Sequence, residues 1–254
     1  MTATLHTDDV FAPVDRDLYL ERIAGGNETE VYRTDDQRYV VKLKHELGGS
    51  RTEALDCAKT MRAAAEQFAA CIGEEHSIPS YYLLARDSSE RVQVLVIQPF
   101  VAHAHPLYDV DYRTLNADER DRVAAQLRAI IRRALSFYRG TRSMPDVYGR
   151  TSTSAAERKR LRSPWKIPER LWSFMVQRNL LRSHNLLLTN APECRVVLVD
   201  YDFVRRSRLY RWVYYTVRRA LFWRDQVLIW RMRRGAKVPR ADSLPAIRAR
   251  HIRA

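Results

Sequence analysis

The sequence predicts an α+β fold in which a small antiparallel sheet is followed by a mainly helical region. Three observations support this prediction. Strand-like runs crowd into the first 100 residues, Gly-rich and Asp-rich turns separate them, and apolar residues at helical spacing dominate the rest. We expect strands over 18–24, 29–33, 38–43, 81–85 and 92–99.

The helices in this prediction have recognisable beginnings. Ser50 is a good N-cap for a helix that Gly73 closes, and Asn116 is a good N-cap for a second helix. Two short apolar runs separated by a turn predict a hairpin near residue 190. We therefore expect helices over 50–72, 116–138 and 163–181, a hairpin of 185–188 with 196–199, and helix from 203 to 235.

Length and composition limit the class of protein. With 254 residues, 46% apolar and 29% charged, the chain suits one globular domain better than two independent ones. Its three cysteines have no metal-binding spacing and form no even set, which indicates a reducing compartment. No secretory signal begins the sequence, and no uninterrupted apolar run reaches the roughly 18 residues of a membrane span. We expect a cytoplasmic protein whose membrane contact, if any, is peripheral and at the inner face.

The net charge of +14 is concentrated in two segments. Residues 150–182 hold nine Lys or Arg against two Glu, and residues 205–254 hold fifteen against two Asp, so the rest of the chain is net acidic. General solubility does not explain this placement. The pattern predicts an anionic substrate or partner.

Several residues have the chemistry of a phosphoryl-transfer site, which holds a polyphosphate with backbone amides, a fixed cation and a metal. Gly25 and Gly26 allow the backbone to approach phosphate, and Lys42 lies among apolar strand residues where it needs a partner. Asn185 precedes one hairpin strand and Asp200 follows the other. We expect this amide and carboxylate to bind magnesium together.

With these residues the chain resembles the protein-kinase-like superfamily, in its bacterial small-molecule and atypical-kinase branch, whose members are aminoglycoside-phosphotransferase-like or lipopolysaccharide-kinase-like. The resemblance runs from about Tyr19 to Phe203 and implies a bilobal fold, with a small lobe over about 16–101, a helical lobe over about 102–235 and a basic tail over 236–254. It also implies ATP and Mg²⁺ as cofactors. Its segments are the Gly-rich loop at 24–32, the hinge at 98–101, the catalytic-loop end at 184–188 and the metal-binding segment at 199–202.

The resemblance implies a role for each site residue. Lys42 would bind the α and β phosphates, Glu53 would pair with Lys42, and Glu66 is the weaker alternative for that pairing. Backbone groups of Gln98 and Phe100 would grip adenine. Asn185 and Asp200 would bind the metal.

The catalytic carboxylate departs from the family pattern, because Leu180 stands five residues before Asn185. The best candidate is Asp146, within Pro145-Asp146-Val147-Tyr148-Gly149-Arg150. Residues 151–183 would then be an insertion inside the catalytic loop. Such an insertion is tolerable, since each doubling of loop length costs only about 0.6 kcal/mol.

Each residue taken alone has a simpler interpretation. Gly25 and Gly26 also suit an ordinary hairpin turn, Lys42 suits a strand lysine whose head reaches water, and Asp200 suits a strand-end cap. Asp202 is more typical of a structural second carboxylate than of a metal ligand. The pair His103 and His105 is more typical of an exposed loop than of a metal site. The order of the parts along the chain is what favours the joint interpretation.

The segment from Ser207 to Arg234 mixes arginines with tyrosines and tryptophans. At about 100° per residue, one side of a helix there would carry arginines and the other would be apolar. The arginines are Arg208, Arg211, Arg218, Arg219 and Arg233, and the apolar residues are Leu209, Val213, Val217, Ala220 and Val227. We expect the apolar side to pack on the helical lobe. An anionic membrane and nucleic acid are the alternative partners for this helix.

Three functions remain open on the sequence. The first is a magnesium-dependent phosphotransferase acting on a hydroxyl of a small molecule, lipid or saccharide, with Asp146 positioning the hydroxyl. The second is a nucleotide-binding pseudokinase or regulatory protein. The third is a non-enzymatic protein that binds a membrane or nucleic acid through its basic helix.

Overall fold

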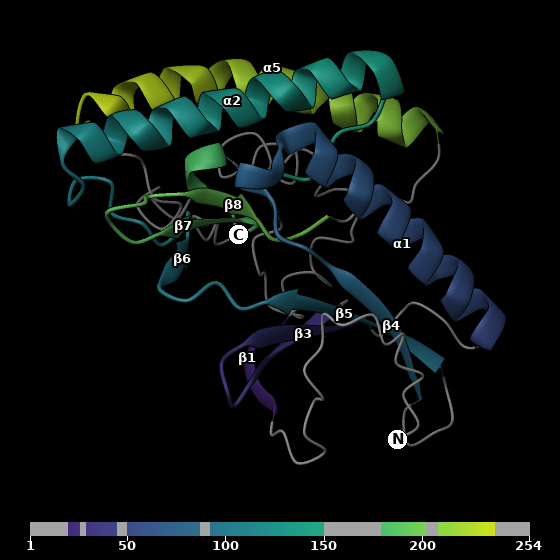
Figure 1. The fold of residues 1–254 in the computed structure, drawn as a ribbon. Helices are drawn as coiled ribbons and strands as arrows, with labels where there is room; N and C mark the ends of the chain where they lie inside the picture. The colour runs from purple at the N-terminus through teal and green to yellow at the C-terminus, as the bar shows by residue number, and fades with distance from the viewer. Residues whose placement is uncertain are drawn as a thin grey trace, which may run out of the picture.

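The computed structural model describes residues 20–25, 29–44, 50–86, 92–149, 179–201 and 208–236. It confirms the α+β class: a small antiparallel sheet comes first and a mainly helical region follows (Figure 1). The strands and helices sort into two hydrophobic clusters, a small one beneath the first sheet and a larger one in the helical region.

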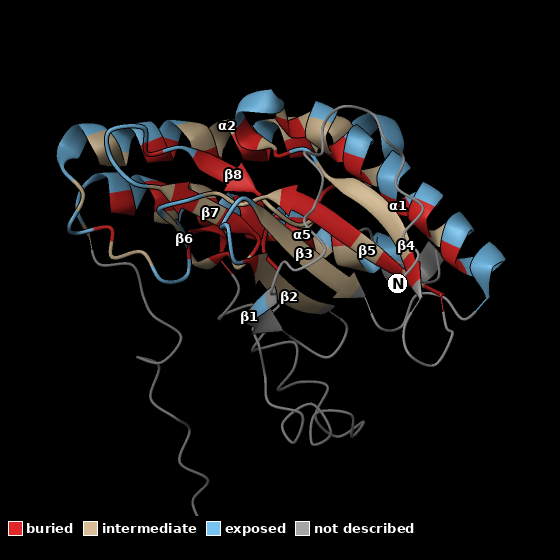
Figure 2. Ribbon diagram, turned by 60° about the horizontal axis from the view of Figure 1, so that its bottom comes forward, coloured by how far each residue is buried: buried red, intermediate tan, exposed pale blue. Residues whose placement is uncertain are grey.

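The first sheet has five antiparallel strands in the order β1-β2-β3-β5-β4. The predicted alternating runs became these strands with small shifts at their ends. Their bounds are β1 Leu20–Gly25, β2 Thr29–Thr34, β3 Tyr39–Lys44, β4 Tyr81–Arg86 and β5 Val92–Pro99. From Val92 to Val96, strand β5 alternates buried and half-buried residues because one face of the sheet packs on a helix (Figure 2).

That helix is α1, Arg51–Ile72, and it begins where the sequence predicts. The Ser50 hydroxyl accepts a hydrogen bond from the backbone N–H of Glu53, and the Glu53 carboxylate accepts one from the N–H of Ser50. The first half of α1 packs against β4 and β5, whereas its second half enters the larger cluster. Its end is followed by the short helix η1, Glu74–His76. Helix α1 therefore contributes to both clusters.

The larger cluster lies between two long helices and a second, three-stranded sheet. Helix α2, Ala117–Thr141, and helix α5, Arg208–Arg233, run side by side (Figure 1). The second sheet has the order β6-β7-β8, with β6 Ala104–Pro106, β7 Leu186–Thr189 and β8 Val196–Leu198. The predicted hairpin is confirmed as β7 and β8, whereas strand β6 has only three residues and gave no sequence signal.

Part of the predicted helix over 163–181 lies outside the described residues, and its end is a single 3-10 turn, η3, Leu180–Arg182. Residues 202–207, where the last helix was expected to begin, are also outside the described residues. Among the described residues, no helix combines the length and the apolar character that crossing a bilayer requires.

The prediction for the packing of α5 was wrong in part, although Arg211, Arg219 and Arg233 are exposed and Val217 packs on the larger cluster as expected. Arg218, expected on an exposed basic side, is fully buried, whereas Val213 and Val227, expected to pack inward, are 46% and 57% exposed. The buried side of α5 consists of Tyr215, Arg218, Leu221, Phe222, Asp225, Ile229 and Met232. A buried ion pair, described below, fixes this orientation of the helix.

Candidate functional site

Lys42 connects the first sheet to the second. It lies on β3 directly opposite Val96 of β5, on the face that packs on α1. Its ammonium Nζ donates a hydrogen bond to the backbone oxygen of Val199 at 2.5 Å, across 157 residues of sequence. The buried side chain of Gln98 also donates to this oxygen, at 3.1 Å, and to Ser80 Oγ at 2.8 Å. Lys42 therefore reaches the residue immediately before Asp200.

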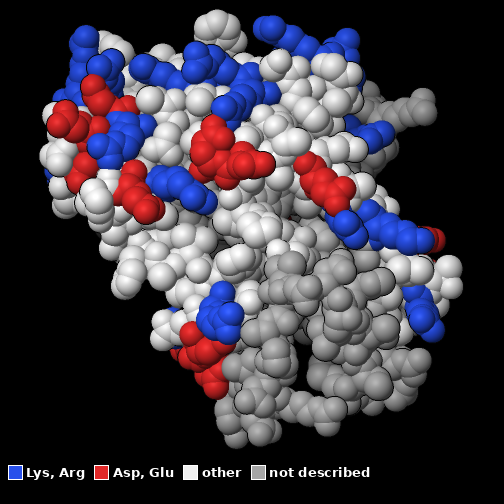
Figure 3. Space-filling view, viewed as in Figure 1, with Lys and Arg blue, Asp and Glu red and all other residues white. Residues whose placement is uncertain are grey.

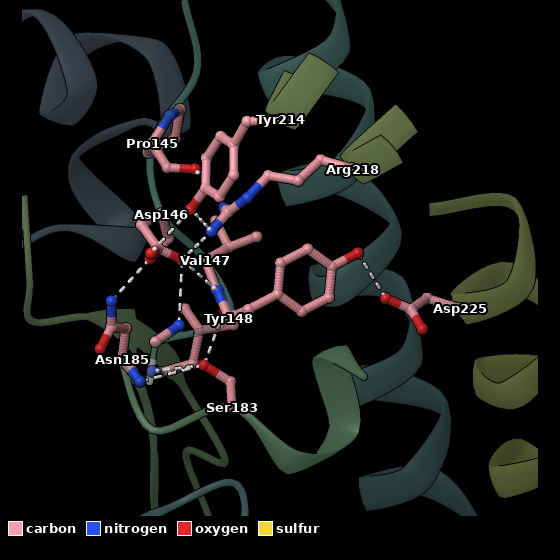
Figure 4. A network of polar contacts seen from close by, with 11 residues as sticks. Pro145, Asp146, Val147, Tyr148, Ser183, Asn185, Tyr214, Arg218 and Asp225 are labelled. Carbon is pink, nitrogen blue, oxygen red and sulfur yellow. Dashed lines mark hydrogen bonds and ion pairs between the residues drawn. The ribbon is translucent and has the colours of Figure 1, made fainter. Parts of the chain in front are cut away.

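The same hydrogen-bond chain continues to Asn185 and Asp146. The N–H of Val199 donates to the backbone oxygen of Asn185 at 2.9 Å, and Asn185 Nδ2 donates to the backbone oxygen of Asp146 at 2.8 Å. Ser183 Oγ holds the turn before β7 by accepting from the N–H of Asn185 and donating to the oxygen of Val147 (Figure 4). The structure thus brings together Lys42, Asn185 and Asp146 with the backbone beside Asp200.

Asn185 and Asp200 have the atoms that a hard cation requires. Within the described part of the chain, no group donates a hydrogen bond to Asn185 Oδ1 or to the carboxylate of the half-buried Asp200. Carboxylate and amide oxygens suit Mg²⁺, which completes its shell with water and substrate phosphate. No group of three or more His, Cys, Asp or Glu residues that could hold a metal exists among the described residues. Among the described residues, Asn185 and Asp200 are the side chains that would hold a magnesium ion here.

The Asp146 carboxylate is held from several sides. Its Oδ1 accepts hydrogen bonds from the N–H groups of Tyr148 and Gly149, both at 3.0 Å, and from Arg218 Nη2 at 2.5 Å. The Tyr214 hydroxyl donates to Oδ2 at 3.3 Å. The side chain is 19% exposed, so it keeps some contact with solvent. The Asp146 carboxylate is therefore fixed in position by donors from its own turn and from α5.

Arg218 is the partner that sequence reasoning missed. Burial disfavours its charge, but the carboxylate of Asp146 and the hydroxyl groups of Tyr214 and Tyr148 together outweigh burial, so the pKa of Arg218 is raised. Its guanidinium lies 5.1 Å from the ring centre of Tyr148 and 4.4 Å from that of Tyr214, and also donates to the Tyr214 hydroxyl. The spacing of Tyr214 and Arg218, four residues apart on one helix face, was the only available signal.

The buried carboxylate of Asp225 extends this hydrogen-bond network through Tyr148. Asp225 Oδ2 accepts a hydrogen bond from the Tyr148 hydroxyl at 2.7 Å and from the N–H of Leu180 at 3.2 Å (Figure 4). Burial raises the pKa of Asp225, and the neighbouring Arg224 opposes that rise. Helix α5 therefore holds both the segment around Asp146 and the turn before Asn185.

Gly149 places the site under a steric constraint. Its φ of +71° lies in the left-handed region, and a Cβ added there would lie 2.5 Å from Asn185 Oδ1. Only glycine fits this position without displacing the Asn185 side chain. His184 lies beside it, with its ring stacked on Tyr108 at 4.2 Å, which suits an orienting role.

The predicted ion pair of Lys42 with Glu53 is not formed, and one backbone group of the predicted hinge already has a partner in the sheet. The exposed Glu53 carboxylate accepts from the N–H of Ser50 in the capping box, and Glu66 pairs with Arg62, so neither acid is paired with Lys42. The N–H of Phe100, expected to grip adenine, donates to the oxygen of Arg38 at 2.8 Å and extends the β3–β5 pairing. The Glu53 carboxylate therefore caps a helix, and the N–H of Phe100 takes part in strand pairing.

The remaining predicted residues lie at or beyond the edge of the described chain. Gly25 is the last residue of β1 and pairs with Glu30 of β2, so it does precede the turn between the two strands. Gly26 lies outside the described residues. The phosphate-binding loop therefore stays a prediction.

The structural likeness of the chain to known proteins is weak. No family model and no curated protein matches the chain. Among solved structures, an aminoglycoside phosphotransferase from Streptomyces rimosus is 12% identical with a TM-score of 0.38, over 87% of each chain. Because this likeness is so weak, the function must be inferred from the chain's own contacts.

Proposed function

We propose that the chain is an ATP- and magnesium-dependent phosphotransferase of the protein-kinase-like type, acting on a hydroxyl of a small molecule, lipid or saccharide. One observation carries the proposal: hydrogen bonds run from Lys42 through Val199 and Asn185 to Asp146. These residues come from three segments far apart in the sequence. A purely structural lysine or hairpin would not require this convergence.

Each side chain has a role in the proposed site. The Lys42 ammonium, which also donates a hydrogen bond to the backbone oxygen of Val199, would bind phosphate oxygens as a fixed cation. Asn185 Oδ1 and the Asp200 carboxylate would hold magnesium, which neutralises charge on the transferred phosphoryl group. Asp146 would orient the acceptor hydroxyl, because three hydrogen bonds to Oδ1 fix its carboxylate in one position.

A nucleotide-binding regulatory protein without turnover is the second candidate. The contacts of Asp146 favour it, because Arg218 and two backbone N–H groups hold the carboxylate in place as a structural ion pair would be held. The capping role of Glu53 favours it too, since that acid does not orient Lys42. Both candidates require the same nucleotide and metal site.

Thermal stability with ATP and Mg²⁺ tests the shared site. At a ligand concentration of about 100 Kd, binding stabilises the folded chain by roughly 2.7 kcal/mol. We expect wild type to show this stabilisation, and Lys42→Ala and Asp200→Asn to lose most of it. Lys59→Ala, on the exposed side of α1, is the matched control and should respond like wild type. A wild-type chain that no nucleotide stabilises would refute both candidates.

Turnover separates the two candidates. In Asp146→Asn the side-chain oxygen can still accept from the N–H groups of Tyr148 and Gly149. A phosphotransferase should keep nucleotide binding in this variant and lose ATP turnover by at least about a hundredfold. A wild-type chain that binds ATP and Mg²⁺ without any turnover would instead favour the regulatory protein.

A further inference from the structure

We propose that the outward face of α5 binds the surface of a bilayer that contains anionic phospholipids. This face comprises Trp212, Val213, Arg219, Ala220, Trp223, Val227, Trp230, Arg231 and Arg234. It lies on the side of α5 away from the larger cluster and includes no residue of the nucleotide site. The inference therefore stands apart from the proposed phosphotransfer.

The apolar part of the outward face is aromatic and well exposed. Trp212, Trp223 and Trp230 are 63%, 80% and 44% exposed. At 3.6 residues per turn, their side chains leave the helix within about 20° of one another. Val213 and Val227 are exposed beside them. Three exposed tryptophans in one line along a helix form an apolar surface that scattered side chains do not explain.

The outward face is also cationic. Its arginines Arg219, Arg231 and Arg234 are exposed, and Arg234 lies over the ring of Trp230 at 3.9 Å. Asp225, the only carboxylate of α5, is buried on the opposite side. Figure 3 shows basic side chains gathered along the edge of the molecule that α2 and α5 form. Helix α2 also has exposed arginines, among them Arg132 and Arg139.

The buried contacts of α5 keep this face directed outward. Arg218 is fixed inward by its ion pair with Asp146, and Asp225 by its bonds to Tyr148 and Leu180. Rotating the helix to bury the tryptophans would expose the larger cluster and break the ion pair between Arg218 and Asp146. The tryptophans therefore remain available at the surface.

A bilayer fits this face better than a nucleic acid does. Tryptophan rings favour the membrane interface, where the ring contacts acyl chains and the N–H contacts water, and arginines attract anionic headgroups. Contact with acyl chains would remove the exposed valine side chains from water, whereas valine has no aromatic ring that could stack on a base. Nucleic-acid strands are usually held in a basic groove, whereas α5 lies along the outer edge of the molecule (Figure 1).

Vesicle binding by the full chain tests the proposal. We expect cosedimentation with vesicles of phosphatidylcholine and phosphatidylglycerol, and little with phosphatidylcholine alone. The combined Trp212→Ser and Trp223→Ser variant should bind at least about tenfold more weakly, because two indole rings no longer leave water. Leu55→Ser, which removes a 40% exposed apolar side chain from α1, is the matched control and should bind like wild type.

A second measurement separates insertion from general charge attraction. Phospholipids with brominated acyl chains should quench tryptophan fluorescence in wild type, and less so in Trp223→Phe. Arg219→Gln with Arg231→Gln should weaken binding, whereas Lys59→Gln on α1 should not.

Several results would overturn the proposal. The first is that wild type does not bind anionic vesicles, and the second is that the Trp212→Ser and Trp223→Ser variant binds them as tightly as wild type. The third is that the same residues bind single-stranded RNA more tightly than vesicles. The fourth is that wild type forms a dimer that Trp223→Ser dissociates. Lys42→Ala should bind vesicles like wild type, and no nucleotide is present in the assay. A failure of the phosphotransfer proposal would therefore leave this result unchanged.

Discussion

At the scale of single residues, the ion pair of Arg218 with Asp146 decides the local structure. Removing a guanidinium from water is costly, so a buried arginine needs a carboxylate and further hydrogen bonds. Asp146 supplies the charge, and Tyr214 and Tyr148 enclose the guanidinium. The segment that carries the candidate catalytic carboxylate is thereby attached to α5.

Gly149 supports a prediction about the metal site. Gly149→Ala would force an L-residue to a φ of +71° at a cost of about 1–2 kcal/mol, and its Cβ would push Asn185 Oδ1 away. We expect a lower free energy of unfolding and markedly weaker Mg²⁺-dependent nucleotide binding, measured by urea denaturation and calorimetry.

Gly140 provides the matched control for this change. It lies in α2, and a Cβ added there meets nothing within 4 Å. Gly140→Ala should stabilise the chain by up to about 1 kcal/mol and leave nucleotide binding unchanged. Equal effects of the two substitutions would contradict a special role for Gly149.

His76 gives a pH dependence of stability. Burial lowers its pKa from the usual 6.5, and its Nδ1 lies 2.9 Å from the oxygen of Val196, which partly opposes that shift. Below pH 6.5 the unfolded chain therefore takes up a proton that the folded chain resists. The free energy of unfolding should fall between about pH 7.5 and pH 5.5.

Urea denaturation at both pH values measures this effect. The fall should shrink in His76→Gln, whose side chain does not titrate. His105→Gln, at an exposed position of β6, should keep the wild-type fall. The same fall in His76→Gln as in wild type would assign it to another group. Glu75 and Asp121, whose pKa values are lowered, lose their contributions only at more acidic pH.

At the scale of elements, the beginning of α1 illustrates how capping competes with catalysis for the same residue. Ser50 and Glu53 satisfy each other's backbone N–H groups, and both are exposed. An acid used in this way stabilises the helix, and Glu53 forms no ion pair with Lys42. Glu53 is therefore assigned to the helix.

Glu53→Gln tests that assignment. Glutamine also serves at this position of a capping box, so we expect a small loss of stability, under about 1 kcal/mol. ATP affinity, measured by calorimetry with Mg²⁺, should change less than about twofold, since no ion pair with Lys42 is lost. A loss of affinity comparable with that of Lys42→Ala would restore Glu53 to the site.

At the scale of the whole molecule, α1 joins the two hydrophobic clusters. Met61, 5% exposed, lies in the small cluster, and Phe68, 2% exposed, lies in the larger one. They are seven residues apart on one continuous helix. Loss of packing at either end therefore weakens the element that both clusters share.

This arrangement predicts cooperative unfolding. Met61→Ala and Phe68→Ala should each lower the free energy of unfolding by about 2–5 kcal/mol and shift one common transition. Urea unfolding followed by near-UV and far-UV circular dichroism measures this. Two separate transitions in Met61→Ala would show that the first sheet unfolds independently of the helical region.

Local patterns made much of the fold predictable. The strand runs, the capping residues Ser50 and Asn116, and the hairpin beside Asn185 all follow from neighbouring residues, and the structure forms them. The orientation of α5 was not predictable, because a count of apolar and charged positions treats Arg218 as a surface residue. Its partner Asp146 lies 72 residues away in the sequence.

The sequence alone determined the α+β class, most element boundaries and the chemical types present in the candidate site, since these depend on short-range periodicity, capping and residue chemistry. Only the tertiary structure decided which of those groups meet: Lys42 with Val199, Asn185 with Asp146, and Asp146 with Arg218. It also turned the tryptophans of α5 outward. The physical reason is that a buried charge requires one specific partner, and the distance between partners along the chain carries no local signal.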